Sequence, residues 1–241
     1  MIGDDDMKKD SKILPIIMFV LLLLGMAFIP YIPLKIFNID LKSLSESVKI
    51  WYNFFCDILF MVIVFFVYKR DYIKNFKDYF KSFGTHFEES FKYYIIGLVI
   101  MLVSNLIIGF CFSGANANNE EAVRNLINLY PIYMLFSVAI YAPFIEETIF
   151  RKSIKNIVLA FGDNKITKYI YIIISGFIFA IMHIVGMATS PLDYLYVVPY
   201  MALGSVFAAL YYKTDNIFSS IIMHSLHNSA AVILYLLLGI A

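Results

Sequence analysis

Seven long apolar stretches, separated by short polar segments, dominate the chain. They lie at about residues 13–33, 48–68, 93–112, 131–161, 169–187, 194–212 and 217–240. A helix that rises 1.5 Å per residue needs about 20 residues to cross the hydrocarbon core of a membrane, and each stretch reaches that length. The pattern predicts an all-α, polytopic membrane bundle of about seven or eight transmembrane helices, the higher number allowing for a re-entrant or split helix.

Residues 70–92, between the second and third stretches, show a different periodicity. Apolar side chains recur there every three or four residues, and basic side chains form a second stripe. The apolar stripe is Tyr72, Ile73, Phe76, Phe80, Phe83 and Phe87, and the basic stripe is Arg70, Lys74, Lys77 and Lys81. This pattern is typical of an amphipathic helix in the headgroup region of a bilayer, with its basic residues toward anionic lipid. The alternative is a solvated charged loop with accidental spacing.

The composition agrees with a membrane protein. Hydrophobic residues make up 61% of the 241 residues and charged residues 15%, with a mean hydropathy of +0.78. Soluble domains are closer to half apolar and a quarter charged. The net charge of +1 provides no global attraction to nucleic acid, so we expect no nucleic-acid partner. The oligomeric state is left open.

The placement of basic residues predicts an orientation. With seven spans and a cytoplasmic N-terminus, most of the 19 Lys and Arg residues fall on the cytoplasmic side. Lys35, Lys42, Lys49 and Arg124 fall on the other side. By the positive-inside rule, we expect a multi-pass protein of the cell membrane with its N-terminus in the cytoplasm and its C-terminus outside. Residues 114–128 then form the longest external loop.

The fourth apolar stretch carries two adjacent carboxylates. Residues 146–151 read EETIFR, within a segment otherwise suited to lipid. Ionised carboxylates are costly in hydrocarbon, so intramembrane glutamates are functional candidates. Residues 154–161 are again largely apolar, so we expect the helix to continue to Gly162, with Lys152 and Lys155 either snorkelling or facing protein. That continuation places Glu146 about 22 Å from this end of the helix.

Helical spacing assigns different partners to the two glutamates. Glu147 and Arg151 are four residues apart, on one helix face, and are expected to form an ion pair. Glu146 is rotated by about 100° from Glu147, which leaves it free to point elsewhere.

Two later stretches place polar groups at a depth similar to that of Glu146. His183 lies 15 residues beyond Lys168, and His224 and Asn228 follow Asp215 by roughly 14 and 20 Å along a helix. His224 and Asn228 are four residues apart, so both project toward one neighbour. His227 points in another direction and is a weaker site candidate.

This set of groups is suited to more than one chemistry. A buried glutamate can act as general base on a water, a histidine can orient that water, and His224 with Asn228 can stabilise an oxyanion. These are the components for amide hydrolysis. Glu146, His183 and His224 could instead hold zinc, with the glutamate as ligand or base. A proton-coupled carrier would also use Glu and His near the middle of a membrane.

Three motifs give the set a family resemblance. EETIFR at 146–151, FAIMH at 179–183 and HSLHN at 224–228 match, in order, the motifs EExxxR, FxxxH and HxxxN/D. The chain thereby resembles the CPBP intramembrane protease family (CAAX protease and bacteriocin-processing proteins, also called Abi), from Leu129 to the C-terminus. The resemblance divides the chain into N-terminal transmembrane helices with the basic interfacial helix (1–128) and a catalytic core (129–241), expected to form one integrated bundle.

The resemblance implies a role for each motif residue. Glu146 resembles the catalytic base that activates water, and His183 a second group that holds this water. His224 and Asn228 resemble the oxyanion-stabilising pair, while Glu147, Arg151 and Phe179 support the site. It implies hydrolysis without a cofactor, zinc being the alternative.

The same resemblance suggests a physiological context. It points to cleavage of a peptide or membrane-protein precursor, in peptide pheromone or bacteriocin maturation or in self-immunity. A non-catalytic scaffold that regulates a sensor kinase or a secretion partner is the main alternative function, and a proton-coupled carrier is the third.

Overall fold

The computed structural model describes residues 4–112 and 114–238, and the regular secondary structure within these ranges is helical. The helices are α1 (Asp4–Phe28), α2 (Ile32–Ile36), α3 (Glu46–Val67), α4 (Lys69–Lys81), α5 (Phe83–Cys111), α6 (Asn118–Leu129), α7 (Pro131–Phe136), α8 (Ala142–Glu146), α9 (Ile154–Leu159), α10 (Lys165–Ile184), α11 (Val197–Thr214) and α12 (Ile217–Leu238). Three 3-10 segments, η1 (Ile29–Tyr31), η2 (Leu41–Ser43) and η5 (Pro191–Tyr196), and two π-helical segments, η3 (Ser137–Tyr141) and η4 (Glu147–Ser153), join them. Within the described ranges, seven helical stretches are long and apolar enough to cross a membrane, which confirms the predicted bundle.

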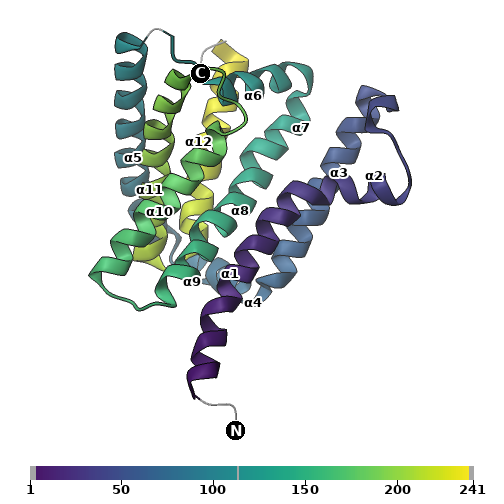
Figure 1. Cartoon of the computed structure of the whole chain (residues 1–241). Helices are drawn as coiled ribbons and strands as arrows, with labels where there is room; N and C mark the ends of the chain where they lie inside the picture. Colours follow the sequence, from purple (N-terminus) through teal and green to yellow (C-terminus); the bar gives the residue numbers. More distant parts are fainter. Residues whose placement is uncertain (1–3, 113, 239–241) are drawn as a thin grey trace.

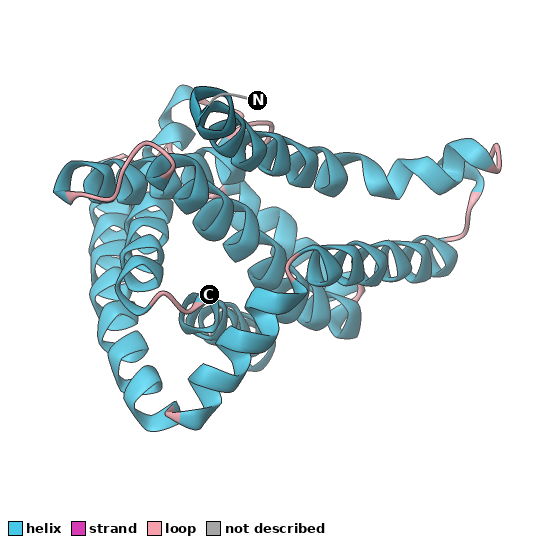
Figure 2. Cartoon of the chain, turned by 90° about the horizontal axis from the view of Figure 1, so that it is seen from below, coloured by secondary structure: helices cyan, strands magenta, loops and turns pink. Residues whose placement is uncertain are grey.

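The helices are arranged side by side around α12. Helix α11 packs against both α5 and α10, and α12 follows beside the helix that runs from α7 to α9 (Figure 1). Helices α1 to α3 lie on the side of that helix that faces away from α12 (Figure 1). Figure 2 shows α2 and the start of α3 projecting away from the other helices. Because α5 is packed against α11, a helix from the first half of the chain is built into the second half.

Helix α4 corrects part of the prediction for residues 70–92. The amphipathic helix ends at Lys81, and residues from Phe83 onward are the first turns of α5. The apolar stripe runs through this boundary because the rings of Phe80, Phe83 and Phe87 stack in succession. The basic stripe of α4 is exposed, as are Phe76 and Phe80, whereas Tyr72 and Tyr79 are buried against the protein.

Residues 114–128 were expected to be the longest external loop between two spans, and most of this connection is helical. Residues 118–129 form α6, with Glu120 and Glu121 in the first turn, where negative charge complements the helix dipole. Ile127 is buried in a small apolar cluster with Met134 and Val232. An acidic first turn followed by apolar residues at helical spacing explains why this polar segment is ordered.

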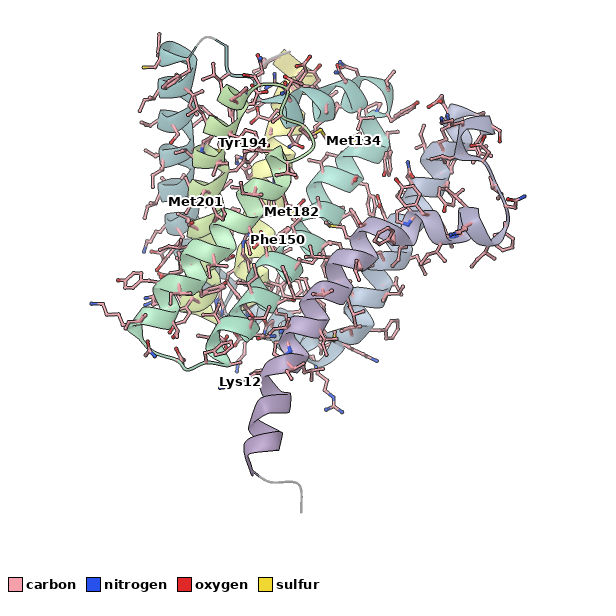
Figure 3. All side chains as sticks on the ribbon, in the orientation of Figure 1. Lys12, Met134, Phe150, Met182, Tyr194 and Met201 are labelled. Atoms are coloured by element: carbon pink, nitrogen blue, oxygen red, sulfur yellow. The ribbon has the colours of Figure 1, made fainter. Side chains whose placement is uncertain are left out.

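The described bundle has two distinct ends. We use "basic end" for the end formed by α4, the turn 160–164 and the turn 214–216, where Lys12 also lies (Figure 3). These segments are joined by hydrogen bonds from Asn216 Nδ2 to the Asn75 carbonyl (2.8 Å) and from Tyr212 Oη to Asp163 Oδ1 (2.6 Å). The opposite end, which we call the loop end, includes residues 114–118 and 185–196, and Tyr194 marks it in Figure 3.

Local signals at the basic end determine where two of the site helices begin. Asn164 starts α10 with a capping box, in which its side chain accepts from the Thr167 amide and Thr167 Oγ1 accepts from the Asn164 amide. Asp215, in the left-handed conformation at φ 48°, ends α11 and allows α12 to start at Ile217. These two turns determine the heights of His183 and His224 in the bundle.

Candidate active site

The helix with the two glutamates continues well beyond Arg151, as predicted. From Pro131 to Leu159 it forms a single apolar span that includes both π-helical segments. Lys152 and Lys155, which this continuation requires to snorkel or to face protein, are largely buried. Their Nζ atoms each lie 2.6 Å from a carboxylate at the basic end, that of Asp71 or that of Asp215.

Glu146 faces two histidines from other helices. Its Oε2 atom lies 4.0 Å from His183 Nε2, in α10, and 3.9 Å from His224 Nε2, in α12. This oxygen is buried and has no hydrogen-bond partner within the described part of the chain. The structure therefore brings together three of the four predicted catalytic side chains around an unpaired carboxylate oxygen.

The hydrogen bonds of both histidines leave Nε2 directed toward Glu146. His183 Nδ1 lies 2.8 Å from the carbonyl of Phe179, which can accept but not donate, so Nδ1 carries the proton. His224 Nδ1 lies 2.9 Å from Glu147 Oε1 and donates to that carboxylate. A water about 2.8 Å from both Glu146 Oε2 and an Nε2 atom subtends about 90° across these gaps, which is a feasible hydrogen-bond geometry.

Glu147 has one predicted partner and one that the sequence did not indicate. Its Oε2 atom lies 3.1 Å from Arg151 Nε, and both side chains are completely buried, so the predicted ion pair is present. The angle between them is poor for a hydrogen bond, and we describe the contact as an ion pair. Its other oxygen holds His224. Glu147 thus connects the arginine of its own helix to a histidine of the site.

Phe179 lies at the centre of the site's aromatic contacts. The Arg151 guanidinium lies 4.3 Å above its ring, and its ring centroid is 4.4 Å from that of His183 and 5.8 Å from that of His224. Gly204 of α11 leaves space for the Phe179 ring, because a Cβ at this position would lie 2.9 Å from Phe179 Cδ1. The predicted supporting residue therefore contacts three of the polar site residues.

Tyr200 is a site residue that sequence reasoning missed. Its ring stacks on His183 at 4.8 Å between centroids, and its hydroxyl accepts a hydrogen bond from Asn119 Nδ2 at 3.4 Å. A signal was present, because Tyr200, Gly204, Phe207 and Tyr211 recur at helical spacing on one face of α11.

Asn228 and His227 form hydrogen bonds with groups other than Glu146. Asn228 Nδ2 donates to the carbonyl of Val138 at 2.8 Å and so ties α12 to η3. One of its two amide N–H groups is committed to this bond. His227 Nδ1 lies 3.4 Å from Tyr94 Oη, on α5, in agreement with its lower rank as a candidate.

The alternative zinc set was Glu146, His183 and His224. Within the described residues, no three His, Cys, Asp or Glu side chains are close enough together to hold a metal ion. Tetrahedral zinc with bonds of about 2.1 Å separates its ligand atoms by about 3.4 Å, which is less than the gaps from Glu146 to either histidine. These side chains as placed do not fit zinc, and we derive no step through it.

Comparison with known proteins places these residues in a family. Residues 128–230 match the family described as type II CAAX prenyl endopeptidase Rce1-like. The chain is 31% identical over 149 residues to the putative membrane peptidase YdiL of Bacillus subtilis. This match covers 61% of this chain and 49% of that protein. It is also 28% identical over 143 residues to the membrane-embedded CAAX protease MroQ of Staphylococcus aureus. This second match covers 58% of this chain and 54% of that protein.

The chain spans about half the length of the curated relatives it matches. No solved structure gives a significant match. The matched segment nevertheless contains Glu146, His183, His224 and Asn228, the residues on which the resemblance rests. These matches support the resemblance to the CPBP family, through the segment that builds this site.

Proposed function

We propose that this multi-pass membrane protein is an intramembrane endopeptidase that hydrolyses a peptide bond with a water activated by Glu146, without a cofactor. The observation that carries the proposal is the unpaired, buried Oε2 of Glu146, set 3.9–4.0 Å from the Nε2 atoms of two histidines. The names of the two relatives, a peptidase and a CAAX protease, support the same reaction class.

The reaction follows from the positions of these groups. Glu146 takes a proton from the water while the water oxygen bonds to the carbonyl carbon of the scissile peptide. The carbonyl oxygen becomes an oxyanion, which a donor on His224 and the remaining N–H of Asn228 would stabilise. When the C–N bond breaks, Glu146 returns its proton to the leaving amine and regains its charge.

His183 and His224 differ in what holds them. His183 is held by a neutral carbonyl, which suits a group that orients the water through Nε2. His224 is held by the carboxylate of Glu147, which stabilises positive charge on the ring when Nε2 also carries a proton. In that state Nε2 donates, as the oxyanion requires.

The substrate class we infer is a peptide or membrane-protein precursor. The family resemblance supports a role in peptide pheromone or bacteriocin maturation, or in self-immunity. We further propose that the basic end faces the cytoplasm of the cell, because most Lys and Arg residues outside the spans belong to that side.

The isosteric variant Glu146→Gln tests the activity. It keeps the side-chain volume but removes the base, so we expect unchanged abundance and helicity, loss of the product peptide and accumulation of its precursor. The measurement is mass spectrometry of membrane and secreted peptides from cells with the wild-type protein or the variant. Normal processing by Glu146→Gln would contradict the proposal, and a phenotype unchanged in both Glu146→Gln and His183→Ala would favour the scaffold function.

A separate measurement tests the cofactor. We expect peptide hydrolysis by the purified protein to be unchanged by strong chelators, and we expect no stoichiometric zinc by elemental analysis. Loss of activity with a chelator that zinc alone restores would overturn the metal-free mechanism.

A further inference from the structure

An open groove runs along the outside of the seam between the two helices that carry most of the site. One wall is the helix from α7 to α8, which leads to Glu146, and the other is α12, which carries His224. The groove has a volume of about 660 Å³, within the range of ligand-binding sites. Its lining includes Phe136, Ala139 and Phe144 on one wall, and Ile221, Ser225 and Ser229 on the other.

The groove is next to the site along both helices. Phe144 precedes Glu146 by two residues, which is a rise of about 3 Å, and Ser225 directly follows His224. The hydrogen bond from Asn228 to the Val138 carbonyl crosses the same seam, beside Ser229 and Ala139. Along the helix axes, the groove lining therefore lies within one turn of both Glu146 and His224.

The two serines distinguish a peptide from a lipid tail as the occupant. Neither Ser225 nor Ser229 forms a hydrogen bond within the described part of the chain. In hydrocarbon an unpaired hydroxyl is costly, and an acyl chain cannot pair with it. A peptide segment can, through its backbone carbonyls or N–H groups. By contrast, Ser104 on α5 satisfies its hydroxyl at 2.7 Å with the Ile100 carbonyl of its own helix.

The remaining lining describes the segment that fits. The other groove residues are apolar, and none is charged. Ala139, Ser225 and Ser229 are small, and small residues let another backbone approach a helix closely. The exposed rim residues Ile132 and Ile140 add apolar contact area.

We propose that this groove, lined by Ala139, Ser225 and Ser229, binds the uncharged, apolar segment of the substrate that adjoins the scissile bond. The proposal rests on the proposed endopeptidase function and names the part of the substrate that the enzyme recognises. Recognition is by apolar contact together with hydrogen bonds from the substrate backbone to the two serines.

Groove-filling variants test the proposal. The probe is the peptide that accumulates in Glu146→Gln membranes, presented to purified protein in lipid vesicles. We expect Ser225→Leu with Ser229→Leu to raise KM at least tenfold while kcat falls less than twofold. Ser225→Ala with Ser229→Ala removes the hydroxyls without filling the groove and should raise KM several-fold. Ser104→Leu is the matched control, a serine replacement in a different span, and should change neither constant.

Cross-linking adds a readout that does not depend on turnover. A photoreactive residue at Ala139 in the Glu146→Gln protein should cross-link to the accumulated peptide, and the same residue at Ser104 should not. An unchanged KM in both serine pairs, or cross-linking of Ala139 to lipid alone, would overturn the groove assignment and leave the endopeptidase function intact. Failure of any peptide to accumulate in Glu146→Gln would overturn both.

Discussion

At the scale of single residues, Glu147 is the side chain with the most connections in the site. One carboxylate oxygen holds His224 Nδ1 and the other faces Arg151 Nε, and neither Glu147 nor Arg151 is exposed. Removing one partner of a fully buried ion pair leaves an uncompensated charge, which typically costs about 3–5 kcal/mol. Stability and catalysis therefore depend on the same carboxylate for different reasons.

A pair of variants separates the two effects. Glu147→Gln should lower the free energy of unfolding by about 3–5 kcal/mol, because Arg151 becomes an unpaired buried charge, and should also reduce peptide hydrolysis. Adding Arg151→Met removes that charge, so most of the stability should return while hydrolysis stays low, since His224 still lacks its anionic acceptor. Denaturant unfolding and hydrolysis assays on the same preparations measure both. Recovery of activity in the double variant would show that Glu147 acts through stability alone.

The sequence predicted the local part of this network and not the part between helices. The pair of Glu147 and Arg151 follows from a spacing of four residues on one helix. The bond from Glu147 to His224 joins residues 77 positions apart, and the contact of Tyr200 with His183 joins two spans. Such contacts depend on how helices rotate against one another, which hydrophobic periodicity defines too coarsely to predict.

At the scale of elements, the packing of α10 on α11 decides where His183 and Phe179 lie. These two helices approach each other closely at Gly176 and Gly204. A Cβ at Gly176 would lie 2.8 Å from the backbone nitrogen of Ser205, so a side chain there must push the helices apart. Phe179 and His183 follow Gly176 by one and two turns and would move with α10.

Two alanine variants test this contact. Gly176→Ala should destabilise the protein by about 1–3 kcal/mol, the usual cost of overpacking, and should reduce hydrolysis because α10 shifts away from Glu146. Gly84→Ala is the control: nothing lies within 4 Å of the added Cβ, and alanine in a helix is favoured over glycine by up to about 1 kcal/mol. Thermal unfolding in detergent should separate the two variants clearly. Equal stabilities would show that α10 and α11 have room to adjust.

The elements also show where a polarity pattern misleads. Residues 114–128 connect two spans and are rich in asparagine, yet their acidic first turn and buried Ile127 make most of them a helix. The stripe at 70–92 is continuous in sequence, yet the backbone turns at Ser82 and divides it between α4 and α5. Polar composition alone therefore does not exclude a helix, and a regular stripe does not guarantee a straight one.

At the scale of the whole molecule, charge is distributed unevenly between the two ends of the bundle. The basic end contains the exposed Arg70, Lys74, Lys77 and Lys81 beside the exposed rings of Phe76 and Phe80. Two further lysines there, Lys152 and Lys155, are paired with carboxylates, whereas the basic stripe of α4 is exposed. A helix with this surface is suited to an anionic membrane leaflet, into which the rings insert.

Anionic lipid should therefore stabilise the protein through α4. Each basic residue near an anionic surface contributes about 1 kcal/mol at low salt, so the combined change Lys74→Gln, Lys77→Gln and Lys81→Gln should remove about 3 kcal/mol of attraction. We expect phosphatidylglycerol to raise the Tm of the wild type above its value in phosphatidylcholine, and to do so much less in the triple variant. Because the interaction is screened within a Debye length, high salt should reduce the wild-type shift as well.

The control variant combines Lys35→Gln with Lys42→Gln, two exposed lysines outside the basic end, and should keep the full shift in Tm. A triple variant stabilised as strongly as the wild type would show that the basic stripe of α4 does not bind the anionic headgroups.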